Sequence, residues 1–433
     1  MKTSSESNTH SFTRREFLKT SSLAVAASAV VPQPAMPAGV SPGETLRIGL
    51  VGCGGRGTGA AAQALAADPK VKLVALGDAF EDRVRTSLAT LKKQGAIAEK
   101  IDVPDARCYL GFDAYQKVIQ ECDVVLLATP PHFRPMHIEA AVAAGKHIFA
   151  EKPIAVDAPG VRRVLAACAE ARRKNLSVVS GLAMRYSYGH REIIKRLQEG
   201  VVGAIRAIQA NDFRGPLWVK PRQPGQTDME YNMRNWYYFT WLSGDFNVEQ
   251  HIHLLDLCSW IMKDEYPVRA YGTGGRQVRT GPDYGNIYDH HSVVYEYANG
   301  TRLYASCRQT SGTMNDISVQ VLGAKGTASV GARGLEITTE ERWVYRGEKN
   351  VSQQTEHDEL FASIRSGKAL NNGDYMSKST LLAILGRMAT YTGQAITWED
   401  AMNSKEDLSP ESYDWNAKPP VSVVAIPGMT KFI

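Results

Sequence analysis

Between Leu46 and about Met184, short apolar runs alternate with amphipathic stretches. The apolar runs are rich in valine, isoleucine and leucine: LRIGLVG, VKLVALGD, VVLLATP, HIFAEK and LSVVSG. Between them lie segments with helical periodicity, such as GAAAQALAAD and DAPGVRRVLAACAEARRK. Continuous apolar strands that alternate with helices are typical of a parallel sheet with helices on both faces. The pattern predicts an α/β domain of the Rossmann type at residues 41–184.

The character of the sequence then changes. IRAIQANDF, at 205–213, has the pattern of a strand, and a long loop rich in aromatic residues follows at 214–244. Later runs such as HHSVVYEY, RLYASCRQT and ISVQVLG have a period of two, which predicts a mostly antiparallel sheet with one solvated face. Two helices close this α+β domain, which we expect at 185–404. The Pro-rich remainder, 405–433, is predicted to form a C-terminal arm.

The first forty residues do not fit either domain. FTRREFLK is followed by the apolar run SLAVAASAVV and then by PQPAMPAG. A basic start, a short apolar run and small residues before a cleavage site are typical of a secretory signal. The pair Arg14 and Arg15 indicates the twin-arginine (Tat) type, and we expect export to the periplasm. The apolar run is too short for a membrane span, and no later segment reaches the ~20 residues that one needs.

Composition excludes some partners. The chain has 433 residues, 43% of them hydrophobic and 22% charged, and a net charge of +5 without a long basic run. Nucleic acid is therefore not an expected partner. The six cysteines form no C-x-x-C pair, and several lie in apolar runs. We interpret them as small buried thiols and not as a disulfide framework or a zinc site.

The first apolar strand leads into a glycine motif, LRIGLVGCGGRGTGAA. It has the spacing G-x-G-x-x-G, follows a strand and opens a helix, which is the context that dinucleotide binding requires. The helix N-terminus offers free N–H groups to a pyrophosphate. Asp78 ends the next strand, and a carboxylate there binds a ribose 2′-hydroxyl and repels a 2′-phosphate, which favours NAD over NADP. The predicted cofactor-binding residues of this region are Gly52, Gly54, Gly55, Arg56, Gly57 and Asp78.

Two further strand ends carry polar residues. In open parallel sheets, ligands bind beyond the carboxyl ends of the strands. ATPPHFRPMH places Thr129, Pro130 and His132 at one such end, and FAEKP places Glu151 and Lys152 at the next. We add these five residues to the predicted cofactor site, although a lysine at a strand end is by itself an ordinary surface residue.

The stretch GDFNVEQHIHLLDL, residues 244–257, contains two histidines among several carboxylates. On a single helix, Glu249, His253 and Asp256 would share one face, since residues three and four apart are neighbours. His251 would lie well round the helix from His253, so the two would not bind one ion together. Three interpretations are open: an acid/base site, a metal site that would need further ligands, and a structural polar network. We expect no metal.

At this point the chain resembles the Gfo/Idh/MocA oxidoreductases, the family of glucose–fructose oxidoreductase and inositol dehydrogenase. The resemblance is carried by GCGGRG, by ATPPHFRPMHIEAAVAAGKHIFAEKP, by QEGVVGAIRAI and by the H-x-x-D of HLLD. It covers most of residues 46–400, and the ending from EHDELF to WEDAM looks like an exported bacterial branch of the family. The resemblance implies an N-terminal Rossmann domain and a C-terminal domain with an open, mostly antiparallel sheet.

The resemblance also implies roles for residues. The lysine of the EKP motif, Lys152, would face nicotinamide and substrate, and His253 would accept a proton. A carboxylate four residues earlier is usually aspartate in the family, whereas this sequence has Glu249. His253 would then be a base with a pKa near neutrality, held by a carboxylate of its own helix. We predict Lys152, His253, Glu249 and Asp256 as catalytic.

The expected substrate is a carbohydrate. Aromatic faces suit sugar rings and arginines suit hydroxyl groups, although aromatic residues also pack in cores and interfaces. The predicted substrate-binding residues are Arg185, Tyr186, Arg214, Trp236, Tyr237 and His253.

The expected function is NAD-dependent oxidation of a sugar, polyol or glycoside. Two alternatives remain open. One is a redox-neutral glycosidase that oxidises its sugar transiently at C3, as some exported relatives do, and the other is a sugar-binding protein without catalysis. Export before use implies a tightly held NAD, because little free NAD exists outside the cell membrane. We further expect a homo-oligomer, a dimer or a tetramer.

Overall fold

The computed structural model describes residues 43–331, 334–421 and 423–433. The predicted Tat signal lies outside these residues. The first half contains a six-stranded sheet in the order β3-β2-β1-β4-β5-β6, in which every pairing is parallel. The strands are β1 (Leu46–Val51), β2 (Val71–Asp78), β3 (Cys108–Leu110), β4 (Val124–Leu127), β5 (His147–Ala150) and β6 (Val178–Ser180).

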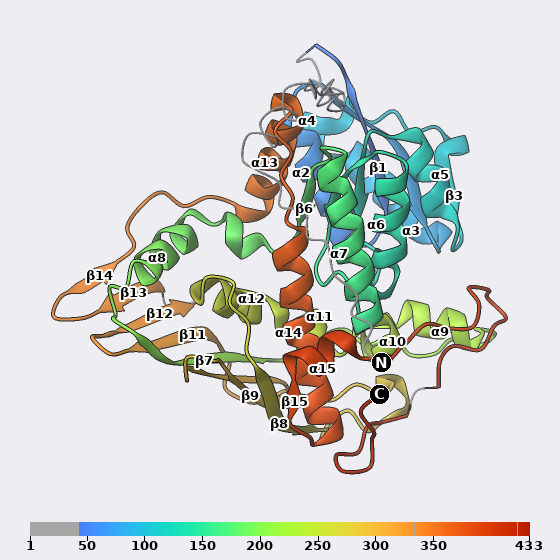
Figure 1. The fold of residues 1–433 in the computed structure, drawn as a ribbon. Coiled ribbons are helices and arrows are strands. Elements are labelled where there is room, and N and C mark those ends of the chain that lie inside the picture. The colour runs from blue at the N-terminus through green and yellow to red at the C-terminus, as the bar shows by residue number, and fades with distance from the viewer. Residues whose placement is uncertain (1–42, 332–333, 422) are drawn as a thin grey trace, which may run out of the picture. The chain divides into compact units, whose positions relative to one another are not determined.

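The helices of this half lie between the strands and cover the sheet (Figure 1). They are α2 (Gly55–Ala67), α3 (Glu81–Lys92), α4 (Gly95–Ala98), α5 (Ala114–Glu121), α6 (Arg134–Ala143) and α7 (Ala158–Arg173). The strand order reverses between β1 and β4, so the carboxyl ends of these two strands flank a crevice that suits a dinucleotide. The predicted Rossmann fold is confirmed.

The second half contains a nine-stranded sheet in the order β14-β13-β12-β11-β7-β10-β9-β8-β15. All its pairings are antiparallel except that of β7 with β10. The prediction of a mostly antiparallel sheet is therefore confirmed. Its strands are β7 (Ile205–Arg214), β8 (Arg269–Gly275), β9 (His290–Glu296), β10 (Arg302–Gln309), β11 (Asp316–Gly323), β12 (Thr327–Gly331), β13 (Gly334–Thr338), β14 (Arg342–Val344) and β15 (Ile396–Thr397).

Helices cover one face of this sheet (Figure 1). Side chains of β10 alternate between buried and more exposed positions, which matches one packed and one solvated face. The helices of this half are α8 (Tyr188–Gln198), α9 (Asp228–Arg234), α10 (Thr240–Ser243), α11 (Phe246–Glu249), α12 (Ile252–Ile261), α13 (Ser352–Ser366), α14 (Gly373–Thr392) and α15 (Trp398–Asn403).

Two late helices join the halves. α13 packs on α2, and its Leu360, Phe361 and Ile364 belong to the same buried cluster as β1 and β2. α14 packs on both α7 and β8. The second half is therefore not separate from the Rossmann half, because its last helices complete the core of the first. Among the described residues, no helix is long and apolar enough to cross a membrane.

Candidate active site

The glycine turn after β1 has the geometry that a pyrophosphate needs. Gly52 has φ +95°, and a Cβ there would lie 2.5 Å from the backbone of Ala128 and Thr129. A Cβ on Gly57 would lie 1.8 Å from the Gly52 carbonyl oxygen, so only glycine allows α2 to start this close to β1. A Cβ on Gly54 or Gly55 would instead meet open space. No side chain therefore covers the backbone N–H groups at the start of α2, and an anion can approach them. The residues of this turn fit the pyrophosphate of NAD.

Asp78 lies at the end of β2 and is already tied to the glycine turn. Its carboxylate accepts hydrogen bonds from the backbone N–H groups of Cys53 (2.6 Å) and Phe80 (3.0 Å). Burial raises the pKa of Asp78 and these two bonds oppose the rise. Asp78 also lines the cavity that the glycine turn opens into, so the carboxylate can accept a ribose hydroxyl there.

This cavity has a volume of about 610 Å³. Eight of the predicted cofactor residues line it: Gly52, Gly54, Gly55, Arg56, Gly57, Asp78, Thr129 and Pro130. Further lining residues were not among the predicted cofactor residues: Arg83, Phe112, Tyr115, His137, Trp218, Lys220, Met233 and Arg234. Phe112, Trp218 and Lys220 lie in loops, and only the tertiary fold brings these loops to the cavity.

Arg56 does not offer a free charge to a phosphate. Its guanidinium forms an ion pair with Glu151 and donates a hydrogen bond to Glu356 of α13 at 3.0 Å. Glu356 is fully buried, and burial together with the charge of Glu151 raises its pKa well above the usual range. Arg56 lines the cavity while its guanidinium links the EKP motif to α13, so its role at the pyrophosphate stays a prediction. Glu151 likewise faces Arg56 and not the cavity.

His132 also has a different place from the predicted one. Its Nε2 lies 2.8 Å from the hydroxyl of Tyr413 in the C-terminal arm, and its ring packs against Trp241 at 5.1 Å between centroids. Burial lowers its pKa to about 4. The prediction that His132 contacts the cofactor is wrong for this structure, because the ring faces the arm. His137, one turn further on, lines the cavity instead.

Lys152 forms a polar contact between the two halves at the site. Its Nζ donates to the backbone oxygen of Glu249 at 2.6 Å and lies 2.9 Å from Glu249 Oε1. Both side chains are mostly buried, with 11% and 13% exposed. The EKP loop and the segment that carries His253 are therefore joined directly by an ion pair.

The predicted single helix over residues 249–256 is wrong. α11 ends at Glu249 and α12 begins at Ile252, with Gln250 and His251 between them. Gln250 has φ −108° and ψ −50°, which bends the chain away from a regular helix. Glu249 consequently does not support His253 along one helix face but is used by Lys152.

His253 is neutral in this arrangement. Burial and the charge of Lys152 lower its pKa to about 3, and Asp212 only partly opposes them. The expectation of a pKa near neutrality is therefore corrected, since the carboxylate meant to stabilise the imidazolium is paired with Lys152. Within the described residues, the His253 ring makes no hydrogen bond, so its neutral nitrogen is available to accept a proton from a bound hydroxyl group.

Asp212 and Arg214, at the end of β7, form a second pair near His253. Arg214 Nε donates to Asp212 Oδ1 at 2.5 Å, and Nδ1 of the buried His251 lies 3.8 Å from Asp212 Oδ2. Burial alone would raise the pKa of Asp212, but His251 and Arg214 outweigh it and the pKa is lowered. Asp212 was not predicted. The sequence indicates Asp212 only indirectly: it lies two residues before Arg214 in the same strand, so both side chains point to the same face of the sheet.

Trp236 and Tyr237, two of the predicted aromatic residues, take different positions. Trp236 lines the cavity. Tyr237 is buried, and its hydroxyl accepts a hydrogen bond from Gln309 Nε2 at 2.8 Å. Burial, followed by the charge of Glu249, raises its pKa well above the usual range, so the phenol keeps its proton. Gln309, at the end of β10, gave no sequence signal.

Arg185, Tyr186 and Asp256 are structural. Arg185 donates to Asp256 at 2.9 Å and to Asp264 at 2.6 Å, and its guanidinium lies 3.9 Å from the ring centroid of Tyr375. The Tyr186 hydroxyl donates to Asn372 Oδ1 at 2.7 Å. Asp256 is therefore not available for catalysis, and Arg185 and Tyr186 are not available for substrate, because their polar groups are satisfied within the protein.

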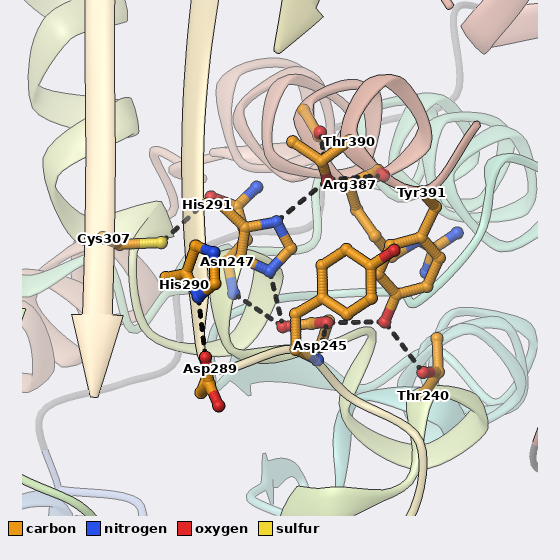
Figure 2. Close-up of polar contacts among 12 residues, drawn as sticks. Thr240, Asp245, Asn247, Asp289, His290, His291, Cys307, Arg387, Thr390 and Tyr391 are labelled. Carbon is orange, nitrogen blue, oxygen red and sulfur yellow. Dashed lines mark hydrogen bonds and ion pairs between the residues drawn. The ribbon is translucent and has the colours of Figure 1, made fainter. Parts of the chain in front are cut away.

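A buried polar cluster fixes the chain just before Glu249 (Figure 2). Asp245 has φ +79°, which is unusual for a residue with a Cβ, and its side chain is fully buried. Its carboxylate accepts hydrogen bonds from the Tyr391 hydroxyl (2.5 Å) and from the Tyr288 backbone N–H (2.9 Å). One carboxylate oxygen also lies 3.1 Å from His291 Nε2. The turn into α11 is thus tied to β9 and α14 at once.

Arg387 of α14 holds the other side of the same turn. Its fully buried side chain donates to the carbonyl oxygens of Val156 (2.7 Å) and Gly244 (3.4 Å), and it pairs with Glu406 of the C-terminal arm. One residue therefore connects the loop after Lys152, the turn before Glu249 and the arm. Among the described residues, no three His, Cys, Asp or Glu side chains are grouped so as to hold a metal ion.

Comparison with known proteins identifies the family. A model of the Gfo/Idh/MocA oxidoreductase family with an NAD-binding Rossmann fold matches residues 46–179, and the model of the family's C-terminal domain matches residues 190–329. The chain belongs to the Gfo/Idh/MocA family and is an oxidoreductase that uses NAD.

Similar proteins act on sugars and polyols. The chain is 25% identical to inositol 2-dehydrogenase of Rhizobium meliloti (strain 1021) over 66% of this chain and 75% of that protein. In structure it is similar to aldose-aldose oxidoreductase of Caulobacter crescentus, with a TM-score of 0.64 at 18% identity over 82% of this chain and 100% of that one. It is also similar to a levoglucosan dehydrogenase in complex with NADH and levoglucosan, with a TM-score of 0.62 at 17% identity over 82% of this chain and 99% of that one.

Proposed function

We propose that this protein oxidises a ring CH–OH group of an uncharged sugar, polyol or glycoside. Bound NAD supplies the redox chemistry of such a reaction, the acceptance of a hydride. The chain itself positions the hydroxyl group: His253 accepts its proton, and Lys152 stabilises the negative charge that develops on its oxygen. The observation that carries the proposal is the convergence of Lys152, Glu249 and His253 beside the NAD-binding half.

The charge balance supports an uncharged substrate. Lys152 is paired with Glu249, and Arg214 is paired with Asp212. His253 is neutral because its pKa is lowered to about 3. The cations near His253 are thus matched by carboxylates, and a substrate with its own charge would have to break one of these pairs. Relatives named for inositol, aldoses and levoglucosan agree with a polyhydroxylated, uncharged ligand.

The test is NADH formation with a panel of sugars, polyols and glycosides, including inositol. The purified full chain should reduce NAD with at least one class, and Lys152→Ala should lose this activity while it keeps its nucleotide. A protein that binds a sugar tightly but never changes the absorbance of its nicotinamide would contradict oxidation and favour a binding role.

A redox-neutral glycosidase is the second candidate. It is supported by the cavity, whose wall comes from both halves of the chain and which would retain a nucleotide between two opposite hydride transfers. In this case the protein would cleave a glycoside without added NAD and without net NADH. Release of the free sugar from aryl glycosides in a buffer free of nucleotide distinguishes it from a dehydrogenase.

Export through the Tat pathway is part of the proposal. It rests on FTRREFLK and the apolar run that follows. Replacement of Arg14 and Arg15 by lysine should leave the precursor inside the cell, whereas retained export would contradict a Tat signal.

We also propose a homo-oligomer. Its support is the open side of the nine-stranded sheet, on which Tyr304 and Leu322 are 43% and 45% exposed. Light scattering of the purified chain tests it, and replacing both residues with serine should reduce the molar mass to that of a monomer.

A further inference from the structure

The cavity that the glycine turn opens into has a second wall. Five of its lining residues come from a segment between β7 and α10, residues 217–236, here called the cover segment. They are Trp218, Lys220, Met233, Arg234 and Trp236. The cover segment includes α9 and belongs to the second half of the chain, so the cavity is lined by residues of both halves.

The cover segment is fastened to the Rossmann half. Arg234 donates to both carboxylate oxygens of Asp82, at 3.1 and 3.3 Å, and to Glu230 at 3.1 Å. Its guanidinium lies 3.9 Å from the ring centroid of Phe80, directly after Asp78 and Ala79. The bidentate ion pair and the cation–π contact together hold the guanidinium in one orientation.

The C-terminal arm packs where the cover segment meets the Rossmann half. The Trp415 ring lies 4.5 Å from Phe112 and 5.2 Å from Phe80, both of which line the cavity. Tyr413 contacts His132 through its hydroxyl. Trp415 and Tyr413 share one apolar cluster with Met229 and Met233 of α9. Figure 1 shows the red arm running beside α9. The arm and the cover segment therefore share one apolar cluster beside the cavity.

Lys220 supplies a positive charge to this wall. Among the described residues, its Nζ has no carboxylate partner, while its backbone N–H donates to Asn235 Oδ1 at 2.9 Å. Asn235 is fully buried and donates in turn to the Asp283 carbonyl oxygen at 2.7 Å. The backbone of Lys220 is held in place, and its ammonium is free to face an anion. Arg56, the cation of the glycine turn, is occupied by Glu151 and Glu356.

We infer that the cover segment binds NAD from the side opposite the glycine turn. Lys220 contributes the charge toward the cofactor phosphates that Arg56 does not offer, and Trp218 and Trp236 form the apolar part of this wall. NAD leaves only when the Arg234–Asp82 contact opens and the cover segment moves. This inference rests on the NAD site alone and is independent of which sugar is oxidised.

Two measurements on the purified full chain test the charge. NAD affinity is measured by calorimetry for Lys220→Met and for a matched control, Lys349→Met, at an exposed lysine of another loop. We expect an about tenfold loss of NAD affinity for Lys220→Met, a weaker dependence on salt, and unchanged affinity for adenosine, which has no phosphate. Equal NAD affinity in the two variants would overturn the role of Lys220.

A release experiment tests the retention. The protein is loaded with NADH, mixed with excess NAD, and the loss of NADH fluorescence is followed in time. Asp82→Asn and Trp415→Ala should each accelerate release at least fivefold, whereas Glu139→Gln, in a surface ion pair with Arg163, should not. Circular dichroism confirms that each variant is folded. Unchanged release from folded Asp82→Asn and Trp415→Ala proteins would overturn the inference, whatever substrate the enzyme takes.

Discussion

Lys152 and Glu249 meet across the interface between the two halves, with Nζ 2.9 Å from Oε1 and 2.6 Å from the backbone oxygen of the same glutamate. The lysine is thus held by two acceptors at a place where it also lowers the pKa of His253. This ion pair holds the lysine that we propose assists the reaction, and its charge adds to burial in keeping His253, the proposed base, neutral.

Loss of the Lys152 ammonium should stop turnover without emptying the nucleotide site. We expect Lys152→Ala to lose at least ~100-fold in kcat, as for other groups that stabilise developing negative charge. The NAD content, measured by mass after denaturation, should match that of the parent protein. A variant with full turnover would remove Lys152 from the reaction.

The same lysine should control the protonation of His253. Because burial and then the charge of Lys152 hold the pKa of His253 at about 3, Lys152→Met should raise this pKa. The measurement is a titration of the histidine ring signals by NMR, with the His253→Gln spectrum to assign the peak. An unchanged pKa in Lys152→Met would mean that burial acts alone.

Two glycines of the turn should respond differently to the same substitution. A methyl group on Gly57 would lie 1.8 Å from the Gly52 carbonyl oxygen, whereas one on Gly54 meets no protein atom within 4 Å. Gly57→Ala should therefore lower the melting temperature by several degrees. Gly54→Ala should fold normally but bind NAD at least ~10-fold more weakly, since the methyl group occupies the approach to the start of α2. Calorimetry and thermal melts measure both, and equal effects in the two variants would contradict this geometry.

The sequence predicted most of the fold because its signals are local. Apolar runs of four to eight residues identified five of the six parallel strands, and G-x-G-x-x-G lies where β1 meets α2. The missed strand β3 has only three residues, Cys108–Leu110, and β14 is equally short. Such strands depend on their neighbours in the sheet and have no periodicity of their own.

The site was harder to predict because its contacts are long-range. The spacing of Glu249 and His253 indicated one helix, but Lys152 binds Glu249 from ninety-seven residues away. Arg56 in the glycine motif pairs with Glu356, three hundred residues later. A periodic pattern identifies which residues share a face only where the helix continues, and it contains no information on which charges meet across domains.

Acid should destabilise the protein through its buried histidines. Burial lowers the pKa of His357 to about 3, below its usual 6.5. Above pH 6.5 neither state binds the proton, and below it only the unfolded chain does, so stability falls as the pH drops from 6.5 toward 3. At pH 5 the loss from this one residue is roughly 2 kcal/mol.

His357→Leu should remove part of this loss. Both ring nitrogens of His357 are buried without a hydrogen-bond partner in the described part of the chain, so leucine breaks no bond there. The melting temperature of His357→Leu should fall less between pH 7 and pH 5 than that of the parent. Parallel pH curves for the two proteins would show that His357 does not control acid stability.

Arg387 should act on catalysis from a distance, as a positioning residue. Arg387 is not among the residues that line the cavity. It donates hydrogen bonds to the carbonyl oxygens of Val156, four residues after Lys152, and of Gly244, five residues before Glu249. Arg387→Met removes these bonds, so the loop and the turn lose their common anchor and the Lys152–Glu249 pair loosens. We expect kcat to fall by about tenfold, with KM for the sugar and the NAD content nearly unchanged, because misplacement of a catalytic group affects the transition state more than binding.

A second variant separates positioning from stability. Removing a buried arginine leaves its acceptors unsatisfied and costs roughly 3 kcal/mol, so rates are compared well below the melting temperature. Glu406→Gln removes the charge partner of Arg387 but keeps its bonds to the Val156 and Gly244 carbonyl oxygens. This variant should melt at a lower temperature and retain nearly full kcat. If kcat instead follows the melting temperature across both variants, then Arg387 only stabilises the fold and does not position Lys152.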